Sequence, residues 1–481
     1  MDDLKNGALY IGTIPSSMDN NRCSVTLEDD GSVTFYIYAP NANKVEVAGM
    51  GGYFSSERIQ LKPDMQGGFS ANIKDFHWAM HFYFWYVDDV CITNPHAAIS
   101  YGCFAAINTF EVPKEGEDFY FVRDVPHGTV SLCKYTSQAN GHIKESYVYT
   151  PPGYESGDER YPVLYLQHGV GENETGWVWQ GKMNFIMDNL IADKKCVPMI
   201  IVASSGYAFK DNEYPVFFPG DFDSELVNSI IPYIEENFKV KKGRNNRAVA
   251  GLSLGSGQAT DIAARHPDLF SAVGVFSGVA IHLMKKIIDS PYRFEAVFMS
   301  AGDEEKEILL GINEMVKEFS RQGKNSTPKV YEGYHEWHVW RKSFKDFAQM
   351  LFTWDDAELD DINKAVPVRS KNIDFTTPVQ ADESMVFFDP VYRQIQFEND
   401  EDGKPAGKYP DVIHGIRVTE DNSIEVNLFA PDAKSVSVVL ENGTEELLYR
   451  SKKNDGYWEK TIGNPAEGFN YVTFMVNGTP V

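Results

Sequence analysis

The stretch that decides the fold of the central part of this chain is RAVAGLSLGSG, residues 247–257. Its first residues predict a short buried strand, and the small and apolar residues after it predict a helix. The sequence G-x-S-x-G lies between them, with Ser253 at its centre. A nucleophile at a tight strand-to-helix turn needs small neighbours, which Gly251 and Gly255 provide. We therefore expect a nucleophilic serine here; the alternative is a structural turn serine.

Around this motif, strands alternate with helices from about residue 120 to residue 354. Unbroken apolar runs at 161–166 and 199–203 are typical of strands buried on both faces of a parallel sheet. The apolar residues of 226–238 fall on one helical face, in which Pro232 predicts a kink. The pattern predicts an α/β fold with a parallel sheet and crossover helices.

A serine at its free pKa is a poor nucleophile, so the fold must bring a base to Ser253. In α/β-hydrolases the order along the chain is serine, acid, histidine. His335 follows a strand-like run that enters a glycine loop, so we expect it to be the base. His266 lies at a helix stop and His282 in an apolar stretch, which suit the role less well. His338 does not complete the H-E-x-x-H spacing of zinc proteases, and we expect no metal or other cofactor.

The acid should follow the apolar run 294–302, where Asp303, Glu304 and Glu305 are consecutive. One of these carboxylates would hold the tautomer of His335 and stabilise its imidazolium form. A solvated acidic helix start is the alternative for all three. The pattern alone leaves the choice among them open.

Two backbone amides should stabilise the oxyanion of an acyl-transfer reaction. One is the amide of Leu254, directly after the nucleophile. The other should come from the glycine loop 167–171, where the amide of Val170 is the best candidate. The alternative for this loop is an ordinary glycine turn.

Four ordered segments resemble the feruloyl esterases and acetylxylan esterases of the first carbohydrate esterase family: 165–177, 188–192, 250–255 and 333–341. The resemblance covers about residues 120–352. It implies Ser253 as nucleophile, His335 as base, and Val170 with Leu254 as oxyanion donors. Many family members carry aspartate at the position of Glu305, whereas Asp303 has that residue type two positions early. The resemblance thus favours Glu305, with Asp303 as the alternative.

The reaction that the resemblance implies is two-step acyl transfer on ferulate or acetate esters of plant-wall xylan. A flat apolar slot for an aromatic acyl group would use Trp177, Tyr207 and Trp337. An acetylxylan esterase is one alternative, and an esterase of siderophores or of S-formylglutathione is a more distant one. A non-catalytic carbohydrate-binding assembly is a further alternative, which the intact set of serine, histidine and acid argues against.

The flanking segments predict small antiparallel sandwiches, which resemble immunoglobulin-like, carbohydrate-binding modules. The run 32–42 matches 423–433, and 87–89 matches 476–478, which indicates an internal repeat. Chance similarity around an Ala-Pro turn is the alternative. The second copy stops at Val481, so we expect the natural protein to be longer. The predicted organisation is a sandwich over 1–115, an α/β-hydrolase domain over 116–356, a linker over 357–409 and a truncated second sandwich over 410–481.

The composition excludes some classes of binding partner. The formal charge of −25 excludes a protein that binds the nucleic-acid backbone. No apolar run has the length of a membrane span, and the first residues do not read as a signal peptide. The expected partners are feruloylated or acetylated xylan and its oligosaccharides, and a polymeric substrate implies secretion, with a leader removed.

Overall fold

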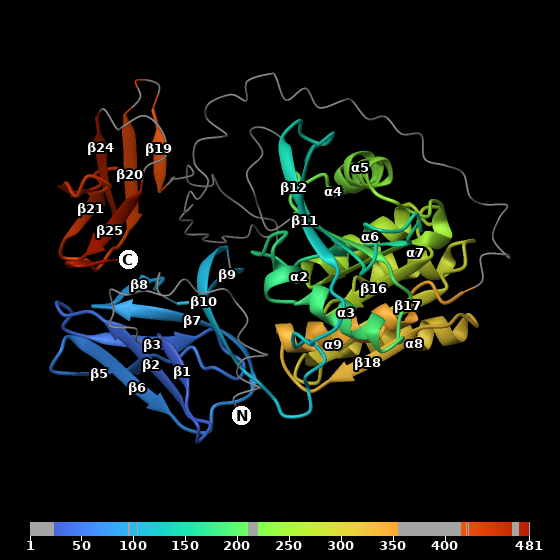
Figure 1. The fold of residues 1–481 in the computed structure, drawn as a ribbon, viewed down its shortest axis with the longest axis horizontal. Helices are drawn as coiled ribbons and strands as arrows, with labels where there is room; N and C mark the ends of the chain where they lie inside the picture. Colours follow the sequence, from blue (N-terminus) through green and yellow to red (C-terminus); the bar gives the residue numbers. More distant parts are fainter. Residues whose placement is uncertain are drawn as a thin grey trace, which may run out of the picture.

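The computed structural model describes residues 24–94, 97–102, 104–209, 220–354, 415–419, 421, 423–463 and 471–480. The predicted linker, 357–409, lies outside these residues. The described parts form a central α/β unit and two β units, which we name the first sandwich (residues 25–112) and the last sandwich (residues 416–480) (Figure 1). No helix in these parts has the length and hydrophobicity that a membrane crossing requires.

The central unit is built on an eight-stranded sheet in the order β11-β12-β14-β13-β15-β16-β17-β18. Strand β12 is antiparallel to both of its neighbours, and the strands from β14 to β18 run parallel. The predicted α/β fold with a parallel sheet is thereby confirmed. The strands are β11 (Thr129–Thr136), β12 (Ile143–Thr150), β13 (Val163–Gln167), β14 (Ile200–Ser204), β15 (Arg247–Leu252), β16 (Ala272–Phe276), β17 (Ala296–Gly302) and β18 (Thr327–Tyr331).

Helices cover both faces of this sheet because successive side chains of each strand point to opposite sides. Leu164 and Leu166 of β13 pack in one core with α3 (Met183–Ala192) and α9 (Trp337–Met350). Val163 and Tyr165 of the same strand pack in the other core. That second core is closed by α5 (Ile231–Asn237), α6 (Leu254–Arg265), α7 (Ile281–Asp289) and α8 (Lys306–Arg321).

The helix expected over 226–238 consists of two segments of different type. Residues Glu225–Ile230 (η1) form a π-helix, and α5 continues from Ile231. Pro232 lies in the first turn of α5. Since proline has no N–H to donate to the preceding turn, the regular α-helical ladder cannot run through this point. The predicted kink takes the form of a change in helix type.

The first sandwich consists of two antiparallel sheets, β1-β2-β6-β5 and β4-β3-β7-β10-β9, with β8 paired to β7. Its core holds Val33, Phe35 and Trp85, each fully buried. The strands are β1 (Val25–Leu27), β2 (Val33–Tyr38), β3 (Val45–Gly49), β4 (Ile59–Gln60), β5 (Lys62–Pro63), β6 (Gly68–Ile73), β7 (Ala79–Val87), β8 (Val90–Ile92), β9 (Ile99–Gly102) and β10 (Ala105–Val112).

Every strand of the last sandwich has a counterpart in the first, since β19-β20-β24-β23 matches β1-β2-β6-β5 and β22-β21-β25-β26 matches β4-β3-β7-β8. Strands β9 and β10 have no counterpart among the described residues of the last sandwich. The two copies also share a turn. Asp88 after β7 and Asn477 after β25 both have positive φ, and each side chain accepts two backbone N–H groups from the loop before β3 or β21. The strands are β19 (Ile416–Val418), β20 (Ile424–Phe429), β21 (Val436–Leu440), β22 (Glu445–Leu447), β23 (Tyr449–Arg450), β24 (Tyr457–Ile462), β25 (Val472–Val476) and β26 (Thr479–Pro480).

A buried ionic cluster fixes the first sandwich to the central unit. Glu111 of β10 accepts two hydrogen bonds from Arg341 of α9 and lies 3.1 Å from the ammonium of Lys182. Burial alone would raise the pKa of Glu111, but Arg341 and Lys182 outweigh it and lower the pKa to about 2. Beside this cluster, the Phe104 amide donates to the Gly171 carbonyl at 3.0 Å. The first sandwich is therefore packed onto the central unit over charged and backbone contacts.

Candidate active site

Ser253 lies at the tight turn between β15 and α6. Its backbone has φ 50° and ψ −115°, a conformation that a residue with a side chain rarely adopts. A Cβ on Gly251 would come within 2.4 Å of the Gly255 backbone, and one on Gly255 within 2.5 Å of the His168 carbonyl oxygen. Both glycines are thus required for the helix to approach the strand, which is the reason that the sequence motif suggested.

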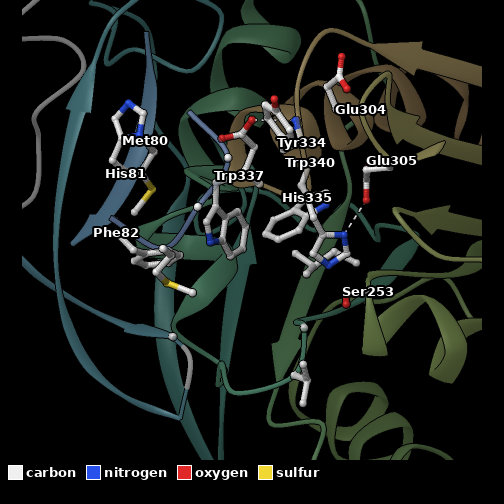
Figure 2. Close-up of a pocket in the computed structure, with 18 of the residues that line it drawn as sticks. Met80, His81, Phe82, Ser253, Glu304, Glu305, Tyr334, His335, Trp337 and Trp340 are labelled. Carbon is white, nitrogen blue, oxygen red and sulfur yellow. Dashed lines mark hydrogen bonds and ion pairs between the residues drawn. The ribbon is translucent and has the colours of Figure 1, made fainter. Parts of the chain in front are cut away.

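The histidine loop and the acid meet at the ends of β17 and β18. His335 Nδ1 lies 2.6 Å from Glu305 Oε1 (Figure 2). Glu305 is itself buried, and its other oxygen accepts from the Ser277 hydroxyl at 2.7 Å and from the Gly302 amide at 2.6 Å. Because a carboxylate can only accept, Nδ1 carries the proton and donates the hydrogen bond, and Nε2 of the neutral imidazole is left as a proton acceptor.

The three consecutive carboxylates have different contacts. Asp303 Oδ1 accepts from the Gly333 amide at 2.9 Å and so anchors the loop that carries His335. Glu304 lies 3.5 Å from the ammonium of Lys306 and is exposed. Glu305 is the carboxylate that contacts the imidazole of His335. The alternative acid, Asp303, holds the backbone of the histidine loop instead.

Ser253 and His335 line one cavity of about 680 Å³. Figure 2 shows the serine hydroxyl beside the imidazole ring, with Glu305 on the far side of the ring. The His335 side chain is 45% exposed, and its ring meets the edge of Trp340 with the ring centres 5.0 Å apart. The imidazole is thereby supported by the protein while its other face remains open to a substrate.

Of the two residues predicted as oxyanion donors, Leu254 directly follows Ser253 and Val170 lines the same cavity as Ser253. Leu254 is the first residue of α6, where the amides have no partner within the helix. Val170 lines the cavity, and hydrogen bonds fix the backbone on both sides of it. The Gly169 amide donates to Glu172 at 2.9 Å, and the Gly171 amide donates to the Tyr207 hydroxyl at 2.7 Å. These contacts hold the loop in one arrangement before a substrate arrives.

The side chain of His168 also holds the loop 167–171 in place. Its Nε2 accepts from the Gly206 amide at 2.8 Å, so the proton is on Nδ1, 2.7 Å from the Gly169 carbonyl. Burial lowers the pKa of His168 to about 4, which keeps the ring neutral. Burial also raises the pKa of Glu172 to about 8 and that of Glu336 to about 7. The neutral form of His168 and the protonated form of Glu172 are therefore favoured at neutral pH beside the Val170 loop.

The aromatic residues predicted for the acyl slot lie in different places. Trp337 lines the cavity. Trp177 does not; it is 1% exposed, and its indole N–H donates to the Gln167 carbonyl at 2.8 Å behind the wall. Tyr207 also lies outside the lining and uses its hydroxyl to hold Gly171. The structure therefore corrects the expectation for Trp177 and Tyr207, which support the site rather than face a substrate.

Sequence reasoning missed two groups of residues. The first is Ser277, whose hydroxyl donates to Glu305. Ser277 directly follows β16, at the edge of the sheet where the other catalytic candidates lie, and this position could have identified it. Met50, Met80 and Phe82 of the first sandwich line the cavity opposite Ser253. The signal for Phe82 was the run HFYFWY at 81–86, which has aromatic residues on both faces and so predicts a strand covered on both sides.

The next histidine along the chain, His338, does not line the cavity. His338 is buried under the His335 loop, and burial lowers its pKa to about 3. Among the residues that the structure describes, no group of three or more potential ligands is arranged to hold a metal ion.

The known proteins that this chain is similar to include esterases. Residues 137–351 match a family model described as "Putative esterase". The chain is 35% identical over 336 residues to an endo-1,4-β-xylanase/feruloyl esterase of Xylanibacter ruminicola, covering 68% of this chain and 45% of that protein. The chain spans less than half the length of the curated relatives that it matches first, 45% and 28%.

One solved structure shows the same fold. The enterobactin esterase of Shigella flexneri aligns with 70% of this chain and 99% of its own, at a TM-score of 0.51 and 15% identity. A ferulic acid esterase of Anaeromyces mucronatus aligns with 50% of this chain and 94% of its own, at a TM-score of 0.43 and 22% identity.

The fold and the family match together define a carboxylic ester hydrolase of the α/β-hydrolase class. Residues 137–351 are thus similar to this esterase family, and the chain is similar to a protein named as a xylanase and feruloyl esterase.

Proposed function

We propose that the chain releases ferulate or related hydroxycinnamates from plant cell-wall xylan through an acyl-enzyme. The observation that carries the proposal is the 2.6 Å contact between His335 and buried Glu305, in a cavity that also contains Ser253. The relative that is 35% identical is named as a xylanase and feruloyl esterase, which supports this substrate class. A cavity of about 680 Å³ is larger than an acetyl group needs, which favours an aromatic acyl group over acetate.

In the first step, Ser253 Oγ attacks the ester carbonyl carbon while its proton passes to His335 Nε2. The negative charge that develops on the carbonyl oxygen is stabilised by the amides of Val170 and Leu254. The bond to the sugar oxygen then breaks, and that oxygen takes the proton from Nε2. Glu305 accepts the hydrogen bond from Nδ1 throughout and stabilises the transient imidazolium.

In the second step, water gives a proton to Nε2 and attacks the acyl carbon. The tetrahedral oxyanion again lies at the two amides. Its collapse breaks the bond to Ser253 Oγ, which regains the proton, and releases the free acid. No cofactor takes part in either step.

The experiment compares hydrolysis of methyl ferulate and 4-nitrophenyl acetate by the wild type and by Ser253→Ala. We expect Ser253→Ala to lose about 10³-fold or more of kcat on both esters, because no nucleophile remains. Ser156→Ala, an exposed serine in a loop of the same unit, is the matched control and should keep full activity. Turnover by folded Ser253→Ala at the wild-type rate would falsify the assignment.

A second readout tests the intermediate directly. A slowly hydrolysed feruloyl ester should leave a feruloyl adduct on the wild type, which mass spectrometry of the intact protein and of its peptides would assign to Ser253. An adduct on another residue, or none during turnover, would contradict the two-step mechanism.

We further propose the domain organisation 1–115, 116–356, 357–409 and 410–481, with immunoglobulin-like flanking domains. The two-sheet architecture and the shared strand order of the sandwiches support it. A polymeric plant-wall substrate also favours an enzyme that acts outside the cell. Retention on insoluble xylan tests whether either sandwich binds carbohydrate.

A further inference from the structure

Strand β7 of the first sandwich has two apolar faces. Tyr83 and Trp85 point into the core of the sandwich, as the alternation of a strand requires. Met80 and Phe82 point the other way and pack with the core of the central unit. Met80 is 6% exposed, and its sulfur lies 3.6 Å from Arg341 Nη2. These two side chains therefore belong spatially to the esterase.

Met80 and Phe82 also line the cavity that contains Ser253. Figure 2 shows them on one side of the site and Ser253 with His335 on the other, with Trp337 between. Gly102 of β9 faces the Phe82 ring, and a Cβ at this glycine would come within 3.1 Å of Cζ. The absence of a side chain at residue 102 leaves room for the Phe82 ring where it is.

The lining of the cavity differs in polarity from one side to the other. The first sandwich contributes apolar side chains, those of Met50, Phe54, Met80 and Phe82, with His81 and three glycines. The beginning of α8 contributes Glu304, Lys306 and Glu307. A planar aromatic acid fits an apolar wall with aromatic and thioether groups, whereas a sugar hydroxyl needs polar partners.

We propose that Met80 and Phe82 of the first sandwich bind the aromatic acyl group of the substrate, so that this β unit determines acyl specificity. This inference rests on the proposed function. The sugar alcohol then lies on the α8 side, beside Lys306 and Glu307. The first sandwich acts as a wall of the active site, and the ionic cluster of Glu111, Arg341 and Lys182 keeps that wall in register with Ser253.

The test uses the full chain and two esters with one leaving group, 4-nitrophenyl ferulate and 4-nitrophenyl acetate. Phe82→Ala should lower kcat/KM for the ferulate ester about tenfold or more, since the acyl ring loses its apolar partner. For the acetate ester, kcat/KM should stay within about twofold, because acetate does not reach Phe82. Phe84→Ala, two residues along the same face of β7 and outside the cavity, is the matched control and should change neither ester.

Phe82→Leu is the control for a folding defect in Phe82→Ala, because leucine keeps the apolar packing but removes the ring. It should show the same selective loss with wild-type thermal stability. Equal losses on both esters, or no loss on either, would overturn the inference and leave the esterase assignment intact. A wild type that cleaves the acetate ester but not the ferulate ester would overturn the substrate class as well.

A binding measurement separates recognition from chemistry. In the Ser253→Ala background, calorimetric titration with ferulic acid should give a Kd several-fold higher when Phe82→Ala is added. An unchanged Kd would contradict direct contact between Phe82 and the acyl group.

Discussion

The two sandwiches share a strand order and a turn, but they use the outer face of one strand differently. In the first sandwich, Phe82 of β7 lines the catalytic cavity. The corresponding residue before β25 in the last sandwich is Tyr471, which is 68% exposed. The first copy is held by the buried Glu111 cluster, whereas a contact between the copies, from Asn41 to the Gly478 carbonyl, is exposed and 3.4 Å long. A repeated fold thus does not imply a repeated role.

The largest effect that separates the copies should come from the ionic cluster. Glu111→Ala leaves Arg341 and Lys182 buried without their acid, so we expect a loss of about 3–5 kcal/mol in the free energy of unfolding. Glu446→Ala in the last sandwich removes a half-exposed partner of Lys460 and should cost about 1 kcal/mol or less. Urea unfolding followed by circular dichroism measures both. Equal losses would mean that the first sandwich is not held more firmly than the last.

The next effect concerns pH. The pKa of Glu172 is raised by burial to about 8, above its ordinary 4.5, so the folded chain binds a proton that the unfolded chain releases. The contribution of this proton to the free energy of unfolding is fully present below pH 4.5, the pKa of the unfolded chain. It is lost as the pH rises toward about 8, the pKa of the folded chain, by roughly 1.4 kcal/mol per pH unit. Glu172→Gln should remove this slope from the melting temperature of the central unit. A slope unchanged by Glu172→Gln would contradict the assignment.

Variants of the shared turn should lose less stability, and the loss should be equal in the two copies. Asp88→Ala and Asn477→Ala each remove an acceptor of two backbone amides, so each should cost roughly 1–2 kcal/mol. Thermal unfolding of the two variants, followed by tryptophan fluorescence, provides the comparison. A large cost in one copy alone would show that the turn is structural in that copy only.

The smallest effect should be that of Tyr471→Ala. The side chain is exposed, so stability should change by about 0.5 kcal/mol or less, and kcat/KM for the ferulate ester should not change. The contrast with Phe82→Ala measures how far the copies have diverged. A loss of activity on soluble esters in Tyr471→Ala would indicate that the last sandwich contributes to the active site.

The central fold and much of the site could be predicted because their signals are local. The G-x-S-x-G turn needs glycine at 251 and 255 for steric reasons that the coordinates reproduce. The order of serine, acid and histidine follows from the parallel sheet, which delivers side chains to one edge. The choice of Glu305 over Asp303 required the family resemblance, since three adjacent carboxylates have no distinguishing pattern.

The position of the first sandwich could not be predicted, because its contacts join segments far apart in sequence and leave no periodic trace. Glu111 and Arg341 are 230 residues apart, and neither residue type predicts burial by itself. The orientations of Trp177 and Tyr207 cannot be predicted from the sequence either, because an aromatic residue type gives no sign of which way its side chain faces. Their hydrogen bonds to Gln167 and Gly171 turn them toward the scaffold.

The hydrogen bond from the Phe104 amide to the Gly171 carbonyl bears on how such enzymes can be recombined. A crossover placed between residue 112 and β11 would separate Gly171, the neighbour of Val170, from its anchor in the preceding unit. Chimaeras that exchange the N-terminal β unit would inherit a loosened catalytic loop, whereas those that join new partners after residue 354 would not. The breakpoint that this chain should tolerate depends on the contacts between the two units, this hydrogen bond and the Glu111 cluster among them, rather than on the boundary between folds alone.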